Sequence, residues 1–272
     1  MGIKQIIHNA LREDIGKGDI TSIAIIPCDL NIKAIIVARE NGKLAGLNIA
    51  KEVFKIIDKK IKFNLKVKEG SYIKSGQVLA EIFGQARSIL SSERVALNFL
   101  QRLSGITTLT DKFVKKIKSS KIKILDTRKT TPNLRLLEKY AVKMGGGFNH
   151  RFGLFDGMLI KDNHIQIAGG INNAIEKARK KYPKMKIEVE AQSLKEVKES
   201  LKANFNVIML DNMNIPDLRK AIKLINGKYK IEVSGGVRLN NISKISQLKI
   251  DYISIGALTH SAKSLNMSLD IK

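Results

Sequence analysis

The stretch KIEVEAQSLKEVKESLKANFNVIMLDNMNIPDLRKAIKLI, residues 186–225, indicates how the C-terminal part of the chain folds. It holds two short candidate strands, KIEVEAQ (186–192) and NVIMLDN (206–212), and each is followed by residues whose apolar positions recur at helical spacing. A strand that is followed by a helix and then by another strand pairs with it in parallel, because the crossover returns the chain to the same edge. The stretch therefore predicts two parallel strands with a helix after each.

The same alternation extends in both directions from this stretch. Six candidate strands lie in KILDTRKT (123–130), GMLIKDNH (157–164), KIEVEAQ (186–192), NVIMLDN (206–212), KIEVSGG (230–236) and DYISIGALTHS (251–261). Successive strand–helix units favour an α/β fold with a parallel (β/α) barrel, here incomplete because the usual number of units is eight. An open doubly wound sheet is the alternative, although its usual G-x-G-x-x-G turn after the first strand is missing.

The residues up to about 85 follow a different pattern. Two segments, 32–38 and 63–67, alternate between apolar and polar residues, and a segment with helical spacing, 47–57, lies between them. They predict a small α+β unit with a largely antiparallel sheet. Ser91 or Ser92 followed by Glu93 predicts the start of a helix that ends near Gly105, with a second helix at 110–118. We therefore expect two domains, an N-terminal α+β domain with a linking helix over 1–108 and a barrel domain over 109–272.

The composition fits a folded protein rather than a disordered polycation. Of the 272 residues 43% are hydrophobic, although 49 Lys and Arg against 25 Asp and Glu give a net charge of +24. The Lys are scattered and aromatic residues make up only 5%, which favours a solvated surface over a nucleic-acid-binding face. A basic RNA- or DNA-binding protein is the alternative from another class. The single cysteine, Cys28, and the lack of a signal peptide or a membrane-spanning apolar run predict a cytoplasmic protein.

Candidate site residues are found at the carboxyl ends of the predicted strands, where parallel (β/α) folds place their functional groups. These ends carry almost only charged residues and glycines: Asp126, Thr127, Arg128, Lys129, Lys161, Asp162, Asn163, His164, Glu188, Glu190, Asp211, Asn212, Ser234, Gly235, Gly236 and Gly256. One such strand end would more often carry a solvated charge or an ion pair. Six in succession indicate a functional site.

Two glutamates on one strand are expected to point into the barrel. In KIEVEAQ, Ile187 and Val189 face one way, so Glu188 and Glu190 face the other. Glu232 follows the same pattern two strands later. Glu190 lies nearer the strand end and is the better functional candidate, whereas a role as a core ion-pair partner suits one of the other glutamates.

The same region predicts a pocket for an anionic ligand. The segment 234–236, Ser-Gly-Gly, is expected to end a strand and open a helix, which would suit a phosphate, and Gly256 takes the equivalent place at the next strand. The loop 143–164 and the first strand end add six cationic or donor groups: Arg128, Lys129, His150, Arg151, Lys161 and His164. Together they suit a ligand with several carboxylates or phosphates. For either histidine alone, a capping or core role is the simpler interpretation.

This set of groups favours substitution at the anomeric carbon of a phosphorylated ribose. The transition state of such a reaction resembles an oxocarbenium ion, which inward carboxylates such as Glu190 and Asp211 would stabilise. A pyrophosphate leaving group would bring Mg²⁺, which is held by few protein carboxylates and by the substrate's own phosphates.

Over essentially its whole length the chain resembles the quinolinate phosphoribosyltransferase family. The resemblance is carried by ALREDIGKGDITS (10–22), LSSERVALNFLQRLSGITT (90–108), ILDTRKTTPNLRLLEKYAVKMGGGFNHRFGLFDGMLIKDNHI (124–165), IEVEAQSLKE (187–196), IMLDNM (208–213), IEVSGG (231–236) and ISIGALTHS (253–261). The family's fold, an α+β sandwich followed by an incomplete (β/α) barrel, agrees with the fold expected from the patterns above. The resemblance implies a pentosyltransferase that converts quinolinate and phosphoribosyl pyrophosphate to nicotinate mononucleotide, CO₂ and pyrophosphate in NAD biosynthesis.

The resemblance also implies roles for individual residues. Quinolinate carboxylates would be bound by Arg94, Arg128, His150 and Arg151, with Thr127, Lys129 and Lys161 beside them. Glu190 and Asp211 would contact ribose hydroxyls and Mg²⁺, and Lys129 and Lys161 would join them as catalytic residues. The 5′-phosphate would lie on Ser234, Gly235, Gly236, Ser254, Ile255 and Gly256.

The resemblance further implies a homodimer, because the family's counterpart of Arg94 reaches into the neighbouring subunit's site. The nearer alternative is a relative of the same fold that acts on a different acceptor, such as the one associated with molybdenum transport. The complete set of Arg94, Arg128 and Arg151 argues against it.

Overall fold

The computed structural model describes residues 2–117 and 121–272, and its contacts divide the chain into two compact units. The first unit comprises Met1–Asp111, Thr130–Gly146 and Ala257–Lys272, and the second comprises Lys112–Lys129 and Gly147–Gly256. The expected domains, 1–108 and 109–272, are each one continuous segment of the chain. The observed units are not continuous, because the first comprises three segments and the second comprises two. The difference lies at 130–146 and 257–272, which pack with the N-terminal residues.

The first unit is built on an antiparallel sheet, as expected for the N-terminal residues. Within the described residues the sheet order is β12 (Met267–Ile271), β1 (Asn31–Ala38), β5 (Val78–Gln85) and β3 (Lys62–Leu65), while β2 (Gly42–Lys43) pairs with β4 (Tyr72–Ile73). The unit also holds the helices α1 (Ile3–Ile15), α2 (Ile20–Ile25), α3 (Leu47–Ile57), α5 (Arg135–Met144) and α11 (Ala257–His260). Ile36, Phe54 and Leu79 are fully buried in its core.

The sequence analysis does not predict strand β12. It pairs with β1 in antiparallel register from Ala34 opposite Ile271 to Ala38 opposite Met267. The strand is short and its partner lies more than two hundred residues earlier in the chain, so no local pattern identifies it.

The helix α4 (Ala86–Lys116) corrects two expectations about where helices begin and end. This single helix replaces the two predicted helices, one that ends near Gly105 and one at 110–118. Residue 118, the predicted end of the second helix, lies outside the described residues. Ser92 does not cap a helix start, because its hydroxyl donates to the carbonyl of Ser88 within α4. Gly105 does not end the helix, which continues to Lys116. A Cβ atom at position 105 would lie 2.0 Å from the carbonyl oxygen of Lys263. The glycine therefore serves the close approach of another segment of the first unit.

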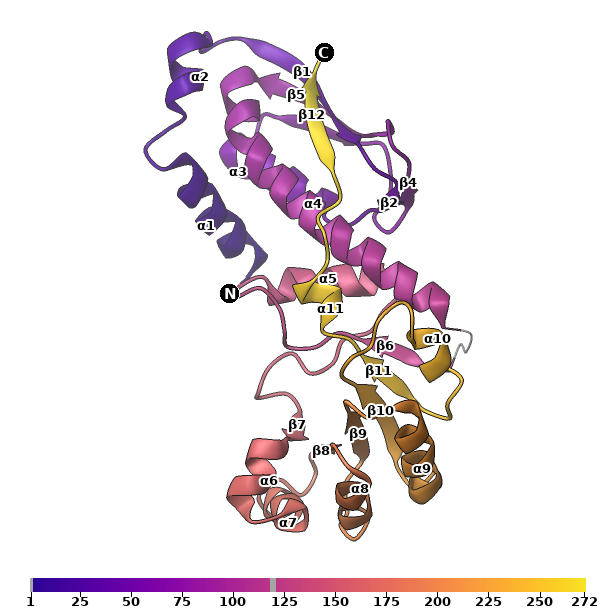
Figure 1. Ribbon diagram of the computed structural model, residues 1–272. Helices are drawn as coiled ribbons and strands as arrows, with labels where there is room; N and C mark the ends of the chain where they lie inside the picture. Colours follow the sequence, from indigo (N-terminus) through magenta and orange to yellow (C-terminus); the bar gives the residue numbers. More distant parts are fainter. Residues whose placement is uncertain (1, 118–120) are drawn as a thin grey trace. The chain divides into compact units, whose positions relative to one another are not determined.

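The second unit contains the expected parallel sheet. In the part of the chain that the structure describes, its order is β6 (Lys123–Leu125), β11 (Tyr252–Ser254), β10 (Lys230–Ser234), β9 (Val207–Asp211), β8 (Ile187–Ala191) and β7 (Met158–Ile160). All five neighbouring pairs are parallel. The helices α6 (Asp162–Ala168), α7 (Ile171–Lys181), α8 (Leu194–Ser200), α9 (Ile215–Ile225) and α10 (Ile242–Ile245) connect the later strands (Figure 1).

The strand order distinguishes the two predicted α/β architectures. Strands β7 to β11 follow one another in chain order, and the first strand, β6, lies beside the last, β11. A doubly wound sheet would place an early strand in its interior and reverse direction there. The observed order is that of a barrel, and it is incomplete because, among the described strands, β6 and β7 are the two sheet edges. The predicted incomplete (β/α) barrel is confirmed.

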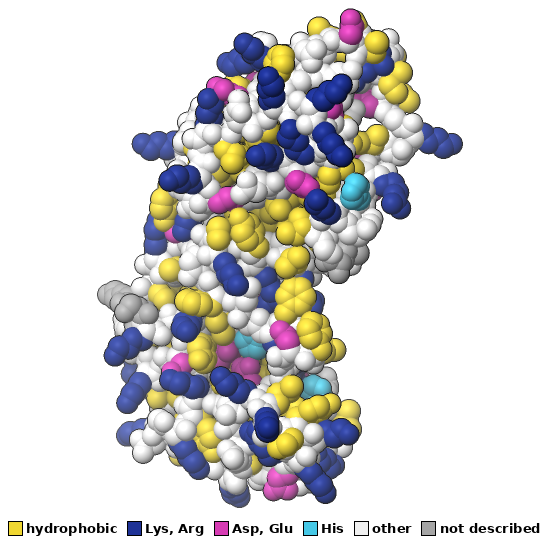
Figure 2. All heavy atoms as spheres, turned by 180° about the vertical axis from the view of Figure 1, so that it is seen from behind, with side chains coloured by type: hydrophobic (Ala, Val, Ile, Leu, Met, Phe, Trp, Pro, Cys, Tyr) yellow, Lys and Arg dark blue, Asp and Glu magenta, His cyan; other side chains and the backbone are white. Residues whose placement is uncertain are grey.

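The positive charge is distributed rather than concentrated. Figure 2 shows Lys and Arg side chains scattered over the visible surface among polar and apolar ones. This distribution agrees with a solvated Lys-rich surface. Among the residues described by the structure, no helix combines the length and the hydrophobicity that crossing a membrane requires.

Candidate active site

The segment DTRK (126–129) and the segment FNHR (148–151), which follows Gly145, Gly146 and Gly147, meet beside strand β6. Phe148 donates its backbone N–H to the carbonyl of Ile124 and accepts one from Asp126, which extends the sheet edge by one bridge. The carboxylate of Asp126, fully buried, accepts the backbone N–H of His150 at 2.9 Å. Asp126 is therefore the anchor that holds the segment after the three glycines against the end of β6.

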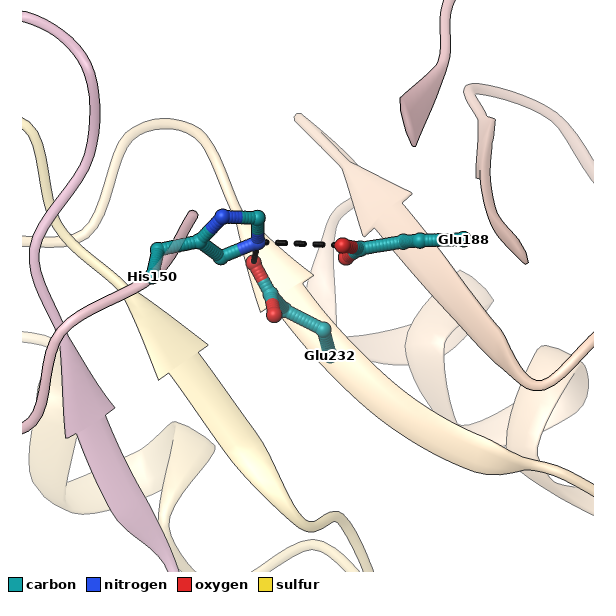
Figure 3. Close-up of side chains that lie close together, drawn as sticks. All are labelled: His150, Glu188 and Glu232. Atoms are coloured by element: carbon teal, nitrogen blue, oxygen red, sulfur yellow. Dashed lines mark ion pairs between the residues drawn. The ribbon is translucent and has the colours of Figure 1, made fainter. Parts of the chain in front are cut away.

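His150 points from this segment into the interior of the parallel sheet. Its Nε2 lies 3.0 Å from a carboxylate oxygen of Glu188 on β8 and 3.6 Å from one of Glu232 on β10 (Figure 3). Its Nδ1 accepts the backbone N–H of Arg151 at 2.8 Å. Both ring nitrogens are thus engaged by the protein itself.

Arg128 and Arg151 supply two guanidinium groups, and the charge of Arg128 acts on Arg151. Burial and the charge of Arg128 lower the pKa of Arg151, whereas the nearby carboxylates of Glu188 and Asp156 raise it. One guanidinium nitrogen of Arg151 donates to the carbonyl of Gly157 at 2.9 Å. Two neighbouring guanidiniums repel each other unless an anion lies between or beside them, so the arrangement suits a ligand with two negative charges.

Lys161 and Glu190 form the second charged pair of the site. Lys161 Nζ lies 2.5 Å from a carboxylate oxygen of Glu190, whose other oxygen accepts from the side chain of Gln192. Glu190 is buried at the end of β8, as its place near the strand end predicts. His164 accepts the backbone N–H of Lys161 through Nδ1 at the start of α6, which is the capping role that a lone histidine favours.

The segment expected to hold phosphate has the predicted place but not the predicted helix. Ser234 ends β10 opposite Asp211, but the next helix, α10, begins only at Ile242 and has four residues. Gly235 and Gly236 both have positive φ, and a Cβ atom on Gly235 would lie 2.2 Å from the side chain of Asn212. The expected helix N-terminus is therefore wrong, and a phosphate here would bind to loop N–H groups.

The other predicted site residues belong to the second unit, except Arg94, which belongs to the first. Thr127 accepts the backbone N–H of Lys129, and Arg128 and Lys129 are exposed after β6. Ser254 is buried at the end of β11, where Ile255 donates its N–H to the carbonyl of Leu125 and Gly256 follows. Arg94 is exposed on α4 in the first unit.

The cluster of His150, Glu188 and Glu232 is the feature that sequence reasoning missed. Alternation along β8 and β10 alone places Glu188 and Glu232 on the inward side of their strands. The pairing of both with one histidine depends on the sheet order, since β8 and β10 are separated by β9. The inward carboxylates could be predicted from the alternation, but their common partner could not.

Two sets of side chains have the donor types of a metal site. The ligand atoms of His150, Glu188 and Glu232 lie within 4.8 Å of one another. However, Nδ1 of His150 accepts an N–H, so a neutral ring carries its proton on Nε2, the atom that faces the carboxylates, and this set does not fit a cation. Asp211 at the end of β9, together with substrate oxygens, has the oxygen donors that Mg²⁺ prefers. Glu190 is less available because both of its oxygens are engaged.

Comparison with known proteins gives consistent results over the whole chain. The model described as quinolinate phosphoribosyl transferase, N-terminal domain, matches residues 19–104, and the corresponding C-terminal domain model matches residues 106–270. The probable nicotinate-nucleotide pyrophosphorylase (carboxylating) of Bacillus subtilis strain 168 is 45% identical over 270 residues, which cover 99% of this chain and 93% of the relative. The chloroplastic nicotinate-nucleotide pyrophosphorylase (carboxylating) of Arabidopsis thaliana is 44% identical and covers 99% and 82%.

Solved structures agree with this similarity. The crystal structure of NadC from Streptococcus pyogenes superposes with a TM-score of 0.95 at 45% identity and covers 99% of this chain and 96% of that one. The nicotinate-nucleotide pyrophosphorylase from Ehrlichia chaffeensis superposes with a TM-score of 0.96 at 42% identity, covering 100% and 99%.

Proposed function

This chain belongs to the quinolinate phosphoribosyltransferase family, and we propose that it converts quinolinate and phosphoribosyl pyrophosphate to nicotinate mononucleotide, CO₂ and pyrophosphate. The observation that carries the proposal is the pair of neighbouring guanidiniums, Arg128 and Arg151, in the unit that bears the strand-end site. A pyridine dicarboxylate offers the two adjacent anions that such a pair accepts. The membership supports the reaction, and the geometry supports the assignment of the substrate's carboxylates to these arginines.

The reaction requires two bond changes in sequence. The ring nitrogen of quinolinate forms a bond with C1 of the ribose as the bond from C1 to the pyrophosphate oxygen breaks and pyrophosphate leaves. The ring then carries a positive charge, so it accepts the electron pair when the bond to the 2-carboxylate breaks and CO₂ leaves, and a proton takes the vacated position. The protein must orient the two reactants and neutralise their charges.

The two arginines and the Lys161–Glu190 ion pair would have different roles in this reaction. Arg128 and Arg151 hold the carboxylates and so orient the ring nitrogen, with Thr127, Lys129 and His150 lining the same region. The carboxylate of Glu190, kept in place by Lys161 at 2.5 Å, lies at the end of β8 and would stabilise positive charge that develops on the ribose. Lys161 would in turn neutralise the phosphates.

The ribose phosphate would lie at the ends of β9 to β11. Asp211 would accept hydrogen bonds from ribose hydroxyls, and the loop N–H groups of Gly235 and Gly236 suit the 5′-phosphate, with the residues 254–256 beside them. Mg²⁺ would be held by Asp211 and substrate oxygens, with Glu190 next to it, and would neutralise charge on the departing pyrophosphate.

The substitution Arg128→Ala tests the assignment of the guanidinium pair. Each charge-assisted hydrogen bond contributes about 1.5–3 kcal/mol, so loss of two should weaken quinolinate binding at least about 100-fold. Isothermal titration with quinolinate and a nicotinate mononucleotide assay would measure the loss, and circular dichroism would check the fold. Arg219→Ala is the matched control, since it removes the same charge from the exposed surface of α9. Turnover by Arg128→Ala close to that of the control would contradict the proposal.

A further inference from the structure

The side chains of His150, Glu188 and Glu232 lie close together in the second unit, and little of each is exposed. Nε2 of His150 approaches Glu188 at 3.0 Å and Glu232 at 3.6 Å, and the side chains are only 12%, 12% and 2% exposed. Figure 3 shows both carboxylates directed at the same ring nitrogen from two different strands. An arrangement this buried needs each donor to have an acceptor.

The tautomer of the ring follows from its second nitrogen. Nδ1 accepts the backbone N–H of Arg151 at 2.8 Å, so it carries no proton. The ring is therefore the Nε2–H tautomer, and its single N–H is donated toward Glu188, the nearer carboxylate.

The two carboxylates cannot both keep a full charge in this setting. Burial, followed by the neighbouring Glu188, raises the pKa of Glu232 to about 8. The strand between the two glutamates, β9, places the apolar Met209 opposite Glu232. Burial and the second carboxylate therefore favour the protonated form of Glu232.

The group is connected to the arginine expected to bind substrate. Arg151 gives its backbone N–H to His150, and the charge of Glu188 raises the pKa of the Arg151 guanidinium. A rotation of the His150 ring would break the hydrogen bond to the Arg151 backbone. These contacts connect the cluster to Arg151.

Resting on the proposed function, we propose that Glu188 and Glu232 are positioning residues for quinolinate binding: Glu188 accepts the Nε2–H of His150, Glu232 lies beside the same nitrogen, and His150 thereby fixes the backbone of Arg151. Neither glutamate touches the substrate in this account. Their effect passes through the imidazole ring.

Two substitutions of Glu188 separate positioning from charge. Glu188→Gln and Glu188→Leu both remove one negative charge near the guanidiniums, but only Gln keeps an oxygen that accepts the Nε2–H. If Glu188 acts only through its charge, both variants should bind the quinolinate dianion more tightly. Positioning predicts a dissociation constant within about threefold of wild type for Gln and at least about tenfold weaker for Leu, by isothermal titration. Tight binding by Leu, or equal weakening in both variants, overturns the proposal.

The ring itself gives a test that needs no variant of the glutamates. Protein with ¹⁵N-labelled histidine rings should show, for His150, a protonated Nε2 and an unprotonated Nδ1 at neutral pH, with the signal assigned by its loss in His150→Gln. An imidazolium or the Nδ1–H tautomer overturns the proposal. Wild-type protein that neither binds nor consumes quinolinate would contradict the proposed function instead, and the tautomer measurement would still decide the cluster.

Discussion

Asp126 shows how one buried carboxylate brings two distant motifs together. The sequence places it at a strand end, but its function there is to accept the N–H of His150, a residue twenty-four positions later. His150 then binds the backbone of Arg151 and the carboxylate of Glu188. The residue types of the site were predictable from their positions at strand ends. Their hydrogen bonds were not, because these depend on backbone angles and on strand order.

The neutral state of Glu232 predicts a pH dependence of stability. Its pKa is raised from 4.5 to about 8 in the folded protein, mainly by burial, so between these values the folded state holds a proton that the unfolded chain releases. Stability should therefore fall as pH rises through this window and change no further above about 8. Glu232→Gln, which resembles the neutral acid, should flatten that slope.

Urea unfolding of wild type and variant from pH 5 to pH 9 would measure the effect. The exposed Glu176→Gln on α7 is the control and should leave the wild-type slope unchanged. A wild-type slope that persists in Glu232→Gln would show that another group holds the proton.

At the scale of elements, the sequence predicted the strands better than the helix ends. The six parallel strands were expected and are found, because alternating short apolar and amphipathic segments leave few other folds. The start of α4 was misplaced because Ser91-Ser92-Glu93 resembles a helix cap, whereas Ser92 lies inside the helix. The helix was likewise expected to end near Gly105, whereas this glycine lies inside α4. The contact that requires a glycine there comes from residue 263, which no local pattern includes.

The close approach at Gly105 predicts a large effect of a small substitution. Alanine usually stabilises a helix relative to glycine by about 1 kcal/mol. Here its Cβ would lie 2.0 Å from the carbonyl oxygen of Lys263, so Gly105→Ala should instead destabilise the protein, by about 1–3 kcal/mol. Chemical denaturation checks this, with Asn98→Ala, an exposed position on the same helix, expected to be neutral or slightly stabilising. A Gly105→Ala variant as stable as that control would refute the account of α4.

At the scale of the whole molecule, the residues that produce most of the net charge of +24 differ from the cationic residues expected at the site. On the face that Figure 2 shows, Lys and Arg side chains are scattered among the others. Most of the cations are Lys, whereas three of the eleven Arg fall in the motifs expected to bind a dicarboxylate. Two of these, Arg128 and Arg151, lie in the second unit, and the third, Arg94, is exposed in the first. The homodimer in which Arg94 completes a partner's site stays a prediction, as does the cytoplasmic location.

Mixed subunits would test that dimer. Arg94→Ala and Arg128→Ala should each be nearly inactive alone, because each removes one partner of the dicarboxylate from every site. After random subunit exchange, half of the dimers would be mixed, and each would have one intact site, so about a quarter of wild-type activity should return. No recovery, with exchange verified by native mass spectrometry, would place Arg94 in the site of its own subunit or outside any site.

The central claim concerns the coupled chemistry of transfer and decarboxylation. Purified protein with Mg²⁺, phosphoribosyl pyrophosphate and quinolinate carrying ¹⁴C in its 2-carboxylate should release labelled CO₂ in amounts equal to the pyrophosphate and the nicotinate mononucleotide formed. Omission of phosphoribosyl pyrophosphate should abolish the release, because the ring accepts the electron pair only after it is ribosylated. Absence of labelled CO₂ in the complete mixture, or release that continues without phosphoribosyl pyrophosphate, would contradict the account.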